Sequence, residues 1–335
     1  MINVAINGFG RIGRAVTRLL CEGAEDHGLR LVAVNDPMPI DLAAHLLRHD
    51  TTYGPCHSSV DFKTDQLQVA GEKISYFRNP VLQSLDWQRS EPHLLIESSG
   101  QYHHSDQLSP VIRGGLKKIL TASPIRGKID ATISFGVNHQ QLATDMSLVS
   151  NASCTTNCLA TVLQPLVERW SIVSGTITSI HATTADQNLQ DGPHADYRLA
   201  RSAIQSIVPT KTGATDALGL VMPQLANRFE GWVMRVPTLN VSALEVTLQF
   251  VKPASAEEVN ETLLAASNQQ LTGILSVVDE PLVSVDFLQH PASAIVDLQM
   301  TKQTGNLIKL LAWYDNEWGF ANRLVDTSCY WGQLQ

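Results

Sequence analysis

The segment from Ser150 to Cys158 carries the residues best suited to covalent chemistry. It reads Ser-Asn-Ala-Ser-Cys-Thr-Thr-Asn-Cys, and an apolar run follows over 159–166. Such polar residues are typical of helix N-caps, so the pattern predicts a helix that begins near Cys154. At a helix N-terminus the dipole and the free N–H groups lower the pKa of a thiol. The same N–H groups would stabilise the oxyanion that forms when a thiolate attacks a carbonyl.

A nucleophilic cysteine needs a base, and His181 is the candidate for that role. It follows the β-forming run 175–180, at the expected junction of a strand and a loop. The chain has 11 histidines, and spacing alone does not establish which of them lies beside Cys154. Cys158 is predicted to be a buried thiol one turn into the helix. No metal site is expected, because a Cys-x-x-x-Cys pair alone lacks further ligands nearby in the sequence.

Residues 7–14 form a glycine-rich turn suited to a dinucleotide. The segment Asn-Gly-Phe-Gly-Arg-Ile-Gly-Arg holds the G-x-G-x-x-G pattern between a predicted strand and a predicted helix. Gly8 permits the tight turn, Gly10 lets the backbone approach a pyrophosphate, and Gly13 permits close packing of helix on strand. Asp36 ends the next apolar run, about 20 residues on, where a carboxylate binds ribose hydroxyls and repels a 2′-phosphate. The pattern therefore predicts a dinucleotide-binding site rather than a glycine-rich turn of some other α/β protein. The carboxylate at Asp36 favours NAD over NADP as the cofactor.

Two kinds of sheet are needed to position these residues. In the first 150 residues, short apolar strand runs alternate with segments of helical spacing, which predicts a mostly parallel, doubly wound sheet. Beyond them, longer β-forming runs predict a more antiparallel sheet. The predicted strands are 4–6, 31–34, 94–96, 119–120, 176–180, 241–250 and 308–313, and the predicted helices are 11–22, 41–47, 159–166 and 256–267. Residues 186–213 lack a clear period, and a long irregular stretch in a compact domain is usually functional.

Composition narrows the class of protein. A chain of 335 residues with 44% hydrophobic and 17% charged residues predicts about two globular domains rather than disorder. The net charge of −8 argues against general binding of nucleic acid or anionic membranes. The five cysteines are irregularly spaced, which predicts reduced thiols rather than disulfides. Because neither a membrane-spanning run nor a signal-peptide pattern is recognisable, we expect a cytoplasmic protein that binds no membrane.

Four motifs, in this order along the chain, resemble those of phosphorylating glyceraldehyde-3-phosphate dehydrogenases. They are N-G-F-G-R-I-G-R, S-N-A-S-C-T-T-N-C, R-V-P-T-x-N-V-S and W-Y-D-N-E-W-G-F. The resemblance covers essentially the whole chain. It implies an α/β fold with a Rossmann NAD-binding domain over 1–152, completed by a C-terminal helix over 317–335. It also implies an α+β catalytic domain with a mainly antiparallel sheet over 153–316. A glycolytic homotetramer would follow, in which residues 186–213 reach the cofactor of a neighbouring subunit.

The resemblance also implies a mechanism and a set of binding residues. Cys154 would attack the aldehyde of glyceraldehyde 3-phosphate with His181 as base, and oxidation by NAD would leave an acyl thioester. Inorganic phosphate would then release 1,3-bisphosphoglycerate. The implied cofactor-binding residues are Gly8, Gly10, Arg11, Ile12, Gly13, Asp36, Arg78, Ser98, Gly100, Thr121 and Asn316. The substrate phosphate would use Thr184, Asp186 and Arg235, with Asp186 orienting donors, and the attacking phosphate would use Ser153, Thr155, Thr212 and Gly213, with Arg235 shared.

Several positions leave other functions open. Leu199 stands where the family pattern has the second arginine of a pair, which removes a cation from the attacking phosphate and costs about 1.5–3 kcal/mol per lost charge-assisted bond. Phe320 and residues 294–297 are similar to erythrose-4-phosphate dehydrogenase, in which water resolves the thioester, whereas Thr212 and Gly213 favour the phosphorylating enzyme. The alternatives are therefore that hydrolytic enzyme, a non-phosphorylating aldehyde dehydrogenase, or a catalytically inactive NAD-binding regulatory protein.

Overall fold

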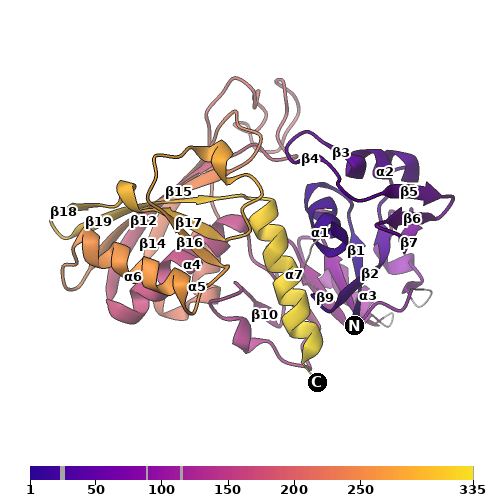
Figure 1. Ribbon diagram of the computed structural model, residues 1–335, viewed down its shortest axis with the longest axis horizontal. Coiled ribbons are helices and arrows are strands. Elements are labelled where there is room, and N and C mark those ends of the chain that lie inside the picture. The colour runs from indigo at the N-terminus through magenta and orange to yellow at the C-terminus, as the bar shows by residue number, and fades with distance from the viewer. Residues whose placement is uncertain (23–26, 88–89, 114–115, 335) are drawn as a thin grey trace. The chain divides into compact units, whose positions relative to one another are not determined.

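The computed structural model describes residues 1–22, 27–87, 90–113 and 116–334 (Figure 1). Its internal contacts divide the chain into two compact units. The first unit contains Met1–Phe135, His139–Ser153 and Ala321–Gln335, and the second contains Gly136–Asn138 and Cys154–Phe320. Residue 335, the predicted end of the C-terminal helix, lies outside the described residues. No helix in the described part of the chain combines the length and apolarity that a membrane span requires.

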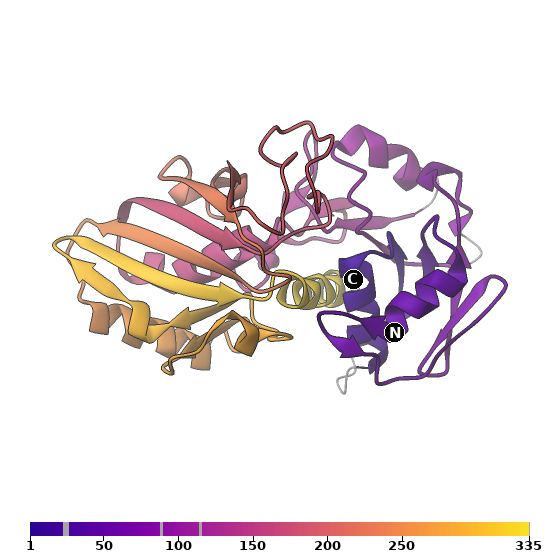
Figure 2. The ribbon, with the colours of Figure 1, turned by 90° about the horizontal axis from the view of Figure 1, so that it is seen from above.

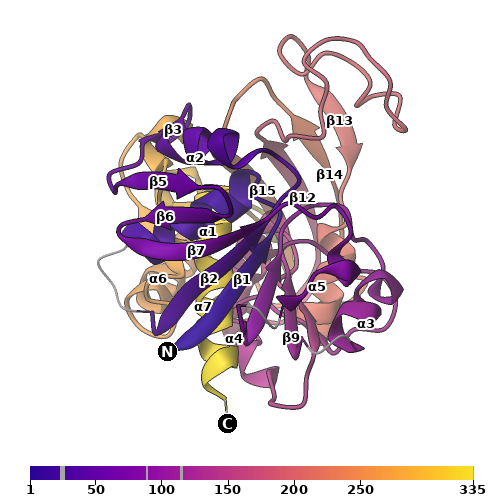
Figure 3. The same cartoon turned by 90° about the vertical axis from the view of Figure 1, so that its right-hand side faces the viewer.

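The first unit is built on a nine-stranded sheet in the order β10-β11-β9-β8-β1-β2-β7-β6-β5. Its strands are β1 (Ile2–Asn7), β2 (Leu29–Asn35), β5 (Val60–Lys63), β6 (Gln66–Val69), β7 (Glu72–Phe77), β8 (Leu94–Glu97), β9 (Lys118–Thr121), β10 (Ala131–Thr132) and β11 (Leu148–Ser150). The strands from β10 to β7 pair in parallel, whereas β7, β6 and β5 form an antiparallel edge that the sequence did not predict (Figure 3).

The central strands of this sheet are buried on both faces, as is typical of parallel strands. All four residues of β8 are buried, and Val4, Ala5 and Ile6 of β1 are inaccessible to solvent. Strands buried on both faces are typical of a doubly wound sheet covered by crossover helices. The helices of this unit are α1 (Arg11–Glu22), α2 (Ile40–Arg48), α3 (Ser105–Arg113) and most of α7 (Trp318–Gln333), with the 3-10 helices η1 (Leu82–Ser84) and η3 (His139–Gln141). A short hairpin of β3 (His49–Asp50) and β4 (Gly54–Pro55) follows α2.

The C-terminal helix α7 joins the first unit through its last turns. Trp331 is fully buried, and Lys118 of β9 donates to its carbonyl oxygen at 2.8 Å while lying over its ring. A second hydrogen bond, from Thr327 Oγ1 to Asn151 Oδ1 at 2.9 Å, ties the helix to the end of β11. These contacts place the C-terminal segment in the same unit as the N-terminal strand.

The second unit is built on a mixed, mainly antiparallel sheet in the order β13-β14-β12-β15-β19-β17-β16, with β18 beside β19. Its strands are β12 (Ile172–His181), β13 (Val208–Lys211), β14 (Phe229–Arg235), β15 (Ser242–Phe250), β16 (Leu275–Val278), β17 (Ala294–Asp297), β18 (Lys302–Thr304) and β19 (Leu307–Tyr314). Its helices are α4 (Cys154–Arg169), α5 (Ala214–Val221) and α6 (Ala256–Asn268), with the 3-10 helices η4 (Pro223–Leu225), η5 (Ser284–Phe287) and η6 (Leu298–Met300). The predicted antiparallel character of this sheet is confirmed, although β12–β14 and β16–β17 pair in parallel.

One face of this second sheet packs against the hydrophobic core. Alternate side chains of β12 point toward that face. Ile177, Ser179 and His181 are buried, whereas Ile180 between them is exposed. Helix α4 contacts α5 and α6 as well as β15 and β19, so the three helices cover the same face (Figure 2). The side chain of His181 therefore lies on the face of the sheet that α4 covers.

Candidate active site

Cys154 is the first residue of α4, as the cap pattern predicted. The preceding turn is strained, because Ala152 is buried and adopts a φ of 57°. A left-handed conformation costs a residue other than glycine about 1–3 kcal/mol, so surrounding contacts must enforce it. One of them is the hydrogen bond that the Ala152 N–H donates to Ser150 Oγ at 3.1 Å. The turn allows α4 to begin at Cys154 only four residues after β11 ends.

His181, at the end of β12, lies beside the cysteine. Its Nε2 is 3.5 Å from Cys154 Sγ, and its Nδ1 is 2.7 Å from the carbonyl oxygen of Ala182. The structure thus selects His181 among the histidines whose proximity the sequence left open. Within the described residues, no group of His, Cys, Asp and Glu side chains is arranged to hold a metal ion.

Burial dominates the protonation of this pair. It raises the pKa of the Cys154 thiol, and the Arg235 charge and hydrogen bonds involving Thr155 oppose it only in part. Burial also lowers the pKa of His181 to about 3, and the Arg235 charge contributes to that shift. The predicted lowering of the thiol pKa is therefore wrong, because the loss of hydration outweighs the nearby positive charge. At neutral pH the pair consists of a thiol and a neutral imidazole.

Arg235 reaches the other side of the histidine ring. It is the register partner of His181 across β12 and β14, and its Nη1 lies 2.6 Å from His181 Nδ1 and 3.2 Å from Ala182 O. A neutral ring nitrogen either donates or accepts, so Nδ1 bonds the carbonyl or the guanidinium but not both. The Nε of Arg235 is buried without a hydrogen-bond partner in the described structure. This donor suits an anion that enters beside His181.

Thr184 and Asp186 form a tight turn after β12. Thr184 Oγ1 donates to Asp186 Oδ1 at 2.5 Å, and the Thr184 N–H donates to the side chain of Gln187 at 3.1 Å. The carboxylate fixes the direction of the Thr184 hydroxyl proton.

Thr212 and Gly213 lie where α5 begins. The Ala214 N–H donates to Thr212 Oγ1 at 3.0 Å, which leaves the Thr212 hydroxyl proton to donate outward. Thr212 lines a cavity of about 670 Å³ together with two cationic side chains, Arg198 and Lys211. Asp216 and Glu230 line it as well. The sequence did not single out Arg198 or Lys211 as neighbours of Thr212, although Lys211 is adjacent to it in the chain.

The three glycines of the N-terminal motif have distinct surroundings. Gly8 has a φ of 89°, and a Cβ there would lie 2.4 Å from the backbone of Ser99. A Cβ on Gly13 would lie 2.2 Å from the carbonyl oxygen of Gly8. A Cβ on Gly10 would meet no atom within 4 Å, so the backbone there faces open space. These are the requirements for a tight turn, close helix packing and the approach of a ligand.

Asp36 faces the same loop. Its Oδ2 accepts from the Phe9 N–H at 2.7 Å and its Oδ1 from the Met38 N–H at 2.9 Å. It lines a cavity of about 150 Å³ with Gly8, Gly10 and Ser98. The remaining lining residues are Asn7, Asn35, Pro37, Asn79, Pro80, Ser99, Gln101 and Tyr102. An acid and a glycine loop around one cavity fit the adenosine ribose and pyrophosphate of a dinucleotide.

Three buried polar side chains form a hydrogen-bonded row beside this cavity, of which Asn7 and Asn35 line it, and they were not identified from the sequence. Asn35 Nδ2 donates to Asn7 Oδ1 at 2.7 Å, and Asn7 Nδ2 donates to Glu97 Oε2 at 2.5 Å. They end the neighbouring strands β2, β1 and β8. Burial raises the pKa of Glu97, while hydrogen bonds from Ser99 and Asn7 oppose that rise. Their signal in the sequence is a polar residue at the end of each apolar run.

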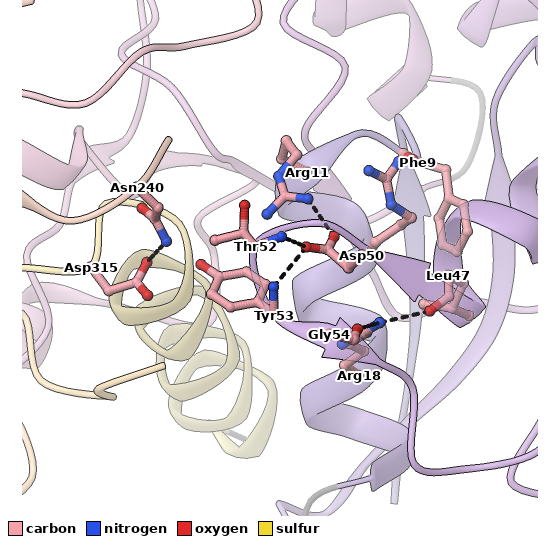
Figure 4. A network of polar contacts seen from close by, with 11 residues as sticks. Phe9, Arg11, Arg18, Leu47, Asp50, Thr52, Tyr53, Gly54, Asn240 and Asp315 are labelled. Carbon is pink, nitrogen blue, oxygen red and sulfur yellow. Dashed lines mark hydrogen bonds and ion pairs between the residues drawn. The ribbon is translucent and has the colours of Figure 1, made fainter. Parts of the chain in front are cut away.

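Arg11 braces the loop that follows α2. It forms an ion pair with Asp50, which also accepts from the N–H groups of Thr52 and Tyr53, and its guanidinium lies over the Tyr53 ring (Figure 4). Burial would raise the pKa of Asp50, but the hydrogen bonds from Tyr53 and Arg11, with the charge of Arg11, lower it overall. The Arg11 side chain thus has a structural role in addition to the predicted cofactor role.

Three of the other predicted cofactor residues lie away from this cavity or in the other unit. Arg78 and Thr121 do not line the small cavity in the described structure: Arg78 is exposed, and Thr121 Oγ1 donates to Ser123 O at 2.8 Å. Asn316 belongs to the second unit, where its Oδ1 accepts from Ser242 Oγ at 2.8 Å. This contact leaves the Asn316 amide group to donate, as binding a carboxamide oxygen requires.

A dinucleotide-binding sheet in one unit and a cysteine–histidine pair in the other define an NAD-dependent dehydrogenase. The family model "Glyceraldehyde 3-phosphate dehydrogenase, NAD binding domain" matches residues 2–105, and the C-terminal domain of the same family matches 153–316. The chain therefore belongs to the glyceraldehyde-3-phosphate dehydrogenase family.

Whole-length relatives agree with the family models. The chain is 45% identical over 329 residues to the chromosomal glyceraldehyde-3-phosphate dehydrogenase of Cupriavidus necator, covering 98% of this chain and 97% of that protein. It is 44% identical over 330 residues to glyceraldehyde-3-phosphate dehydrogenase of Pseudomonas aeruginosa, with the same coverage. It is 42% identical over 334 residues to glyceraldehyde-3-phosphate dehydrogenase 2 of Staphylococcus aureus, covering 99% of this chain and 96% of that protein.

Proposed function

We propose that the chain oxidises glyceraldehyde 3-phosphate with NAD and inorganic phosphate to give 1,3-bisphosphoglycerate. The observation that carries the proposal is the 3.5 Å separation of Cys154 Sγ and His181 Nε2 at the start of α4. The names of the relatives support the choice of substrate. A location in the cytoplasm is part of the same proposal.

The reaction begins with transfer of the Cys154 proton to His181 Nε2, once the substrate phosphate offsets the Arg235 charge that contributes to the low pKa of His181. This requires the ring tautomer in which Nδ1 carries a proton and donates to Ala182 O. The sulfur then bonds to the aldehyde carbon, and the histidine returns its proton to the resulting alkoxide, while N–H groups at the start of α4 stabilise that oxygen. The bound cofactor supplies the hydride acceptor. As His181 removes the hydroxyl proton again, the adduct becomes an acyl thioester on Cys154.

Two anion sites complete the proposed reaction. Arg235, with its unpartnered Nε, and the Thr184 hydroxyl hold the phosphate of the substrate, and Asp186 orients that hydroxyl. The attacking phosphate uses Thr212, Gly213, Ser153 and Thr155.

Arg198 and Lys211 line the same cavity as Thr212 and supply positive charge near the position where Leu199 replaces an arginine. Because Asp216 and Glu230 also line it, we assign the anion to the end of the cavity at Thr212. This arrangement favours phosphate over water as the group that releases the product, because two cations beside a hydroxyl donor stabilise a dianion.

The cofactor would lie against Gly8, Gly10, Arg11, Ile12, Gly13, Asp36 and Ser98, with Gly100, Arg78 and Thr121 further along the same edge and Asn316 on the carboxamide. A homotetramer is supported by the exposure of apolar side chains within 186–213. Leu189 is 71% exposed and Tyr197 is 90% exposed. Large apolar side chains exposed in one segment are typical of a surface that another chain covers.

Initial rates of NADH formation test the reaction. The substrates are glyceraldehyde 3-phosphate and erythrose 4-phosphate, each with and without inorganic phosphate. A fast rate on the triose that requires phosphate is expected. A faster rate on the tetrose that does not require phosphate would overturn the proposal in favour of hydrolysis, as Leu199 alone suggests.

Reactivity of Cys154 separates a live site from an inactive binding protein. In the folded, NAD-loaded chain, iodoacetate should label Cys154 stoichiometrically, at a rate that rises with pH as the thiol ionises. A Cys154 that stays unlabelled, together with no NADH formation on either sugar, would favour a regulatory protein that only binds NAD.

A further inference from the structure

Tyr314, the last residue of β19, packs beside His181 and Thr155. It has no role in the reaction described above. Its side chain is 1% exposed. Its hydroxyl oxygen is 3.0 Å from Thr155 Oγ1 and 2.9 Å from Ser179 Oγ, and both partners are buried. Thr155 Oγ1 is in turn 4.0 Å from Cys154 Sγ. The three hydroxyls therefore form a row from β12 to the reacting sulfur, out of contact with bulk water.

We propose that Tyr314 is a positioning residue whose hydroxyl fixes the direction of the Thr155 hydroxyl, so that Thr155 donates its proton toward Cys154 Sγ. The inference rests on the proposed function of Cys154. It concerns a group that touches neither the substrate nor the reacting atoms.

Counting protons gives the row its direction. Each of the three hydroxyls has one proton, and each oxygen accepts through its lone pairs. If Ser179 donates to Tyr314, Tyr314 to Thr155 and Thr155 to Cys154, every hydroxyl proton has an acceptor among these contacts. In the opposite direction, the Ser179 proton has no acceptor among them. Because buried polar groups are almost always hydrogen-bonded, the first direction is favoured.

The environment keeps this donor in place at any working pH. Burial raises the pKa of Tyr314 further above its ordinary value, and the neighbouring thiols of Cys154 and Cys158 add to that rise. The phenol therefore remains a donor when Cys154 ionises. Hydrogen bonds in a chain polarise one another, so the Tyr314 bond strengthens the one from Thr155 to sulfur. The rings of Tyr314 and His181 pack edge to face, with their centroids 6.0 Å apart, and a phenylalanine at position 314 would keep this contact.

The test follows alkylation of Cys154 by iodoacetamide against pH, with the labelled peptide identified by mass spectrometry. Tyr314→Phe and Thr155→Val each remove one hydroxyl and keep the side-chain shape. In each we expect the midpoint to rise by about one pH unit, which is about a tenfold loss of rate below the midpoint. The double variant Tyr314→Phe with Thr155→Val should show the same shift as Thr155→Val alone, because Tyr314 acts through Thr155.

Matched variants keep the inference open to refutation. Tyr330→Phe removes a tyrosine hydroxyl in the first unit and should leave the midpoint unchanged. Ser179→Ala removes the far end of the row and should shift the midpoint in the same direction by less. An unshifted midpoint in Tyr314→Phe, or shifts that add in the double variant, would overturn the inference. A wild-type Cys154 that is unreactive would instead refute the proposed function, so the two failures are distinguishable.

Discussion

Because His181 is buried as a neutral imidazole, the free energy of unfolding of the chain depends on pH. A histidine in the unfolded chain takes up a proton near pH 6.5, whereas His181 in the folded chain resists protonation down to about pH 3. Between these values the unfolded state binds the additional proton, so stability falls as the pH falls through this window. Above pH 6.5 the histidine imposes no such loss.

We therefore expect His181→Gln to flatten the acid side of the stability profile. The free energy of unfolding of the wild-type chain should fall by at most about 1.4 kcal/mol more per pH unit than that of the variant. Urea unfolding at pH 7, 6 and 5 measures this difference. His57→Gln, which removes an exposed histidine, is the control. Equal slopes in the wild type and His181→Gln would contradict the burial of a neutral imidazole.

At the scale of elements, the glycine turn separates a packing role from a binding role. Gly13→Ala forces a Cβ to within 2.2 Å of the Gly8 carbonyl, so α1 must move away from β1. We expect a loss of about 1–3 kcal/mol in stability and weaker NAD binding. Gly10→Ala meets no atom within 4 Å, so its stability should remain unchanged while its NAD affinity falls.

Chemical unfolding and NAD titration of these two variants measure both effects. Cys154 belongs to the other unit. Its reactivity toward iodoacetamide therefore serves as a check that the remainder of the chain is folded. If Gly10→Ala binds NAD as tightly as the wild type, the cofactor does not approach the backbone at this turn.

The cavity beside α5 makes a prediction about phosphate. Lys211→Ala removes one of its two cations, and we expect the KM for inorganic phosphate to rise about 10- to 100-fold, because a charge-assisted hydrogen bond contributes about 1.5–3 kcal/mol. The KM for the aldehyde should change little. Lys252→Ala, beyond the end of β15, is the control. A KM for phosphate that is the same in Lys211→Ala and the wild type would mean that Lys211 does not contact the attacking anion.

At the scale of the whole molecule, the exposed apolar residues of 186–213 predict an assembly. Leu189→Asp should shift the sedimenting species from a tetramer toward smaller forms, because burial of the aspartate costs free energy only in the assembly. Leu264→Asp places the same charge on the exposed side of α6 and should leave the assembly intact. A wild-type chain that sediments as a monomer at every concentration would refute the homotetramer.

Prediction from the sequence succeeded where the signal was local. Helix α1 spans the predicted residues 11–22, and α6 ends one residue beyond the prediction, because apolar spacing and caps act within a few residues. The cap pattern likewise placed Cys154 at the start of α4. The antiparallel edge β5–β7 was missed, although the alternation of polar and apolar residues in β6 and the glycine at position 71 are the local signals of a hairpin.

Contacts between distant segments could not be predicted. Tyr314 reaches Thr155 across 159 positions of the sequence, and Arg235 meets His181 only because β14 pairs in parallel with β12. The thiol pKa was predicted in the wrong direction for the same reason: burial of Cys154 is a property of the assembled unit, whereas the helix N-terminus is visible in the sequence.

The contact between Arg235 and His181 bears on which aldehydes the chain would oxidise. While Nη1 donates to Nδ1, the ring proton remains on Nε2, and the imidazole cannot accept the thiol proton. A substrate phosphate would draw Arg235 away and free Nδ1 to donate to Ala182, whereas an aldehyde without phosphate would leave the arginine in place. Unphosphorylated glyceraldehyde should therefore turn over slowly even at saturation, and a kcat equal to that of its 3-phosphate would contradict this. Aldehydes that lack a phosphate would occupy the site while consuming little NAD.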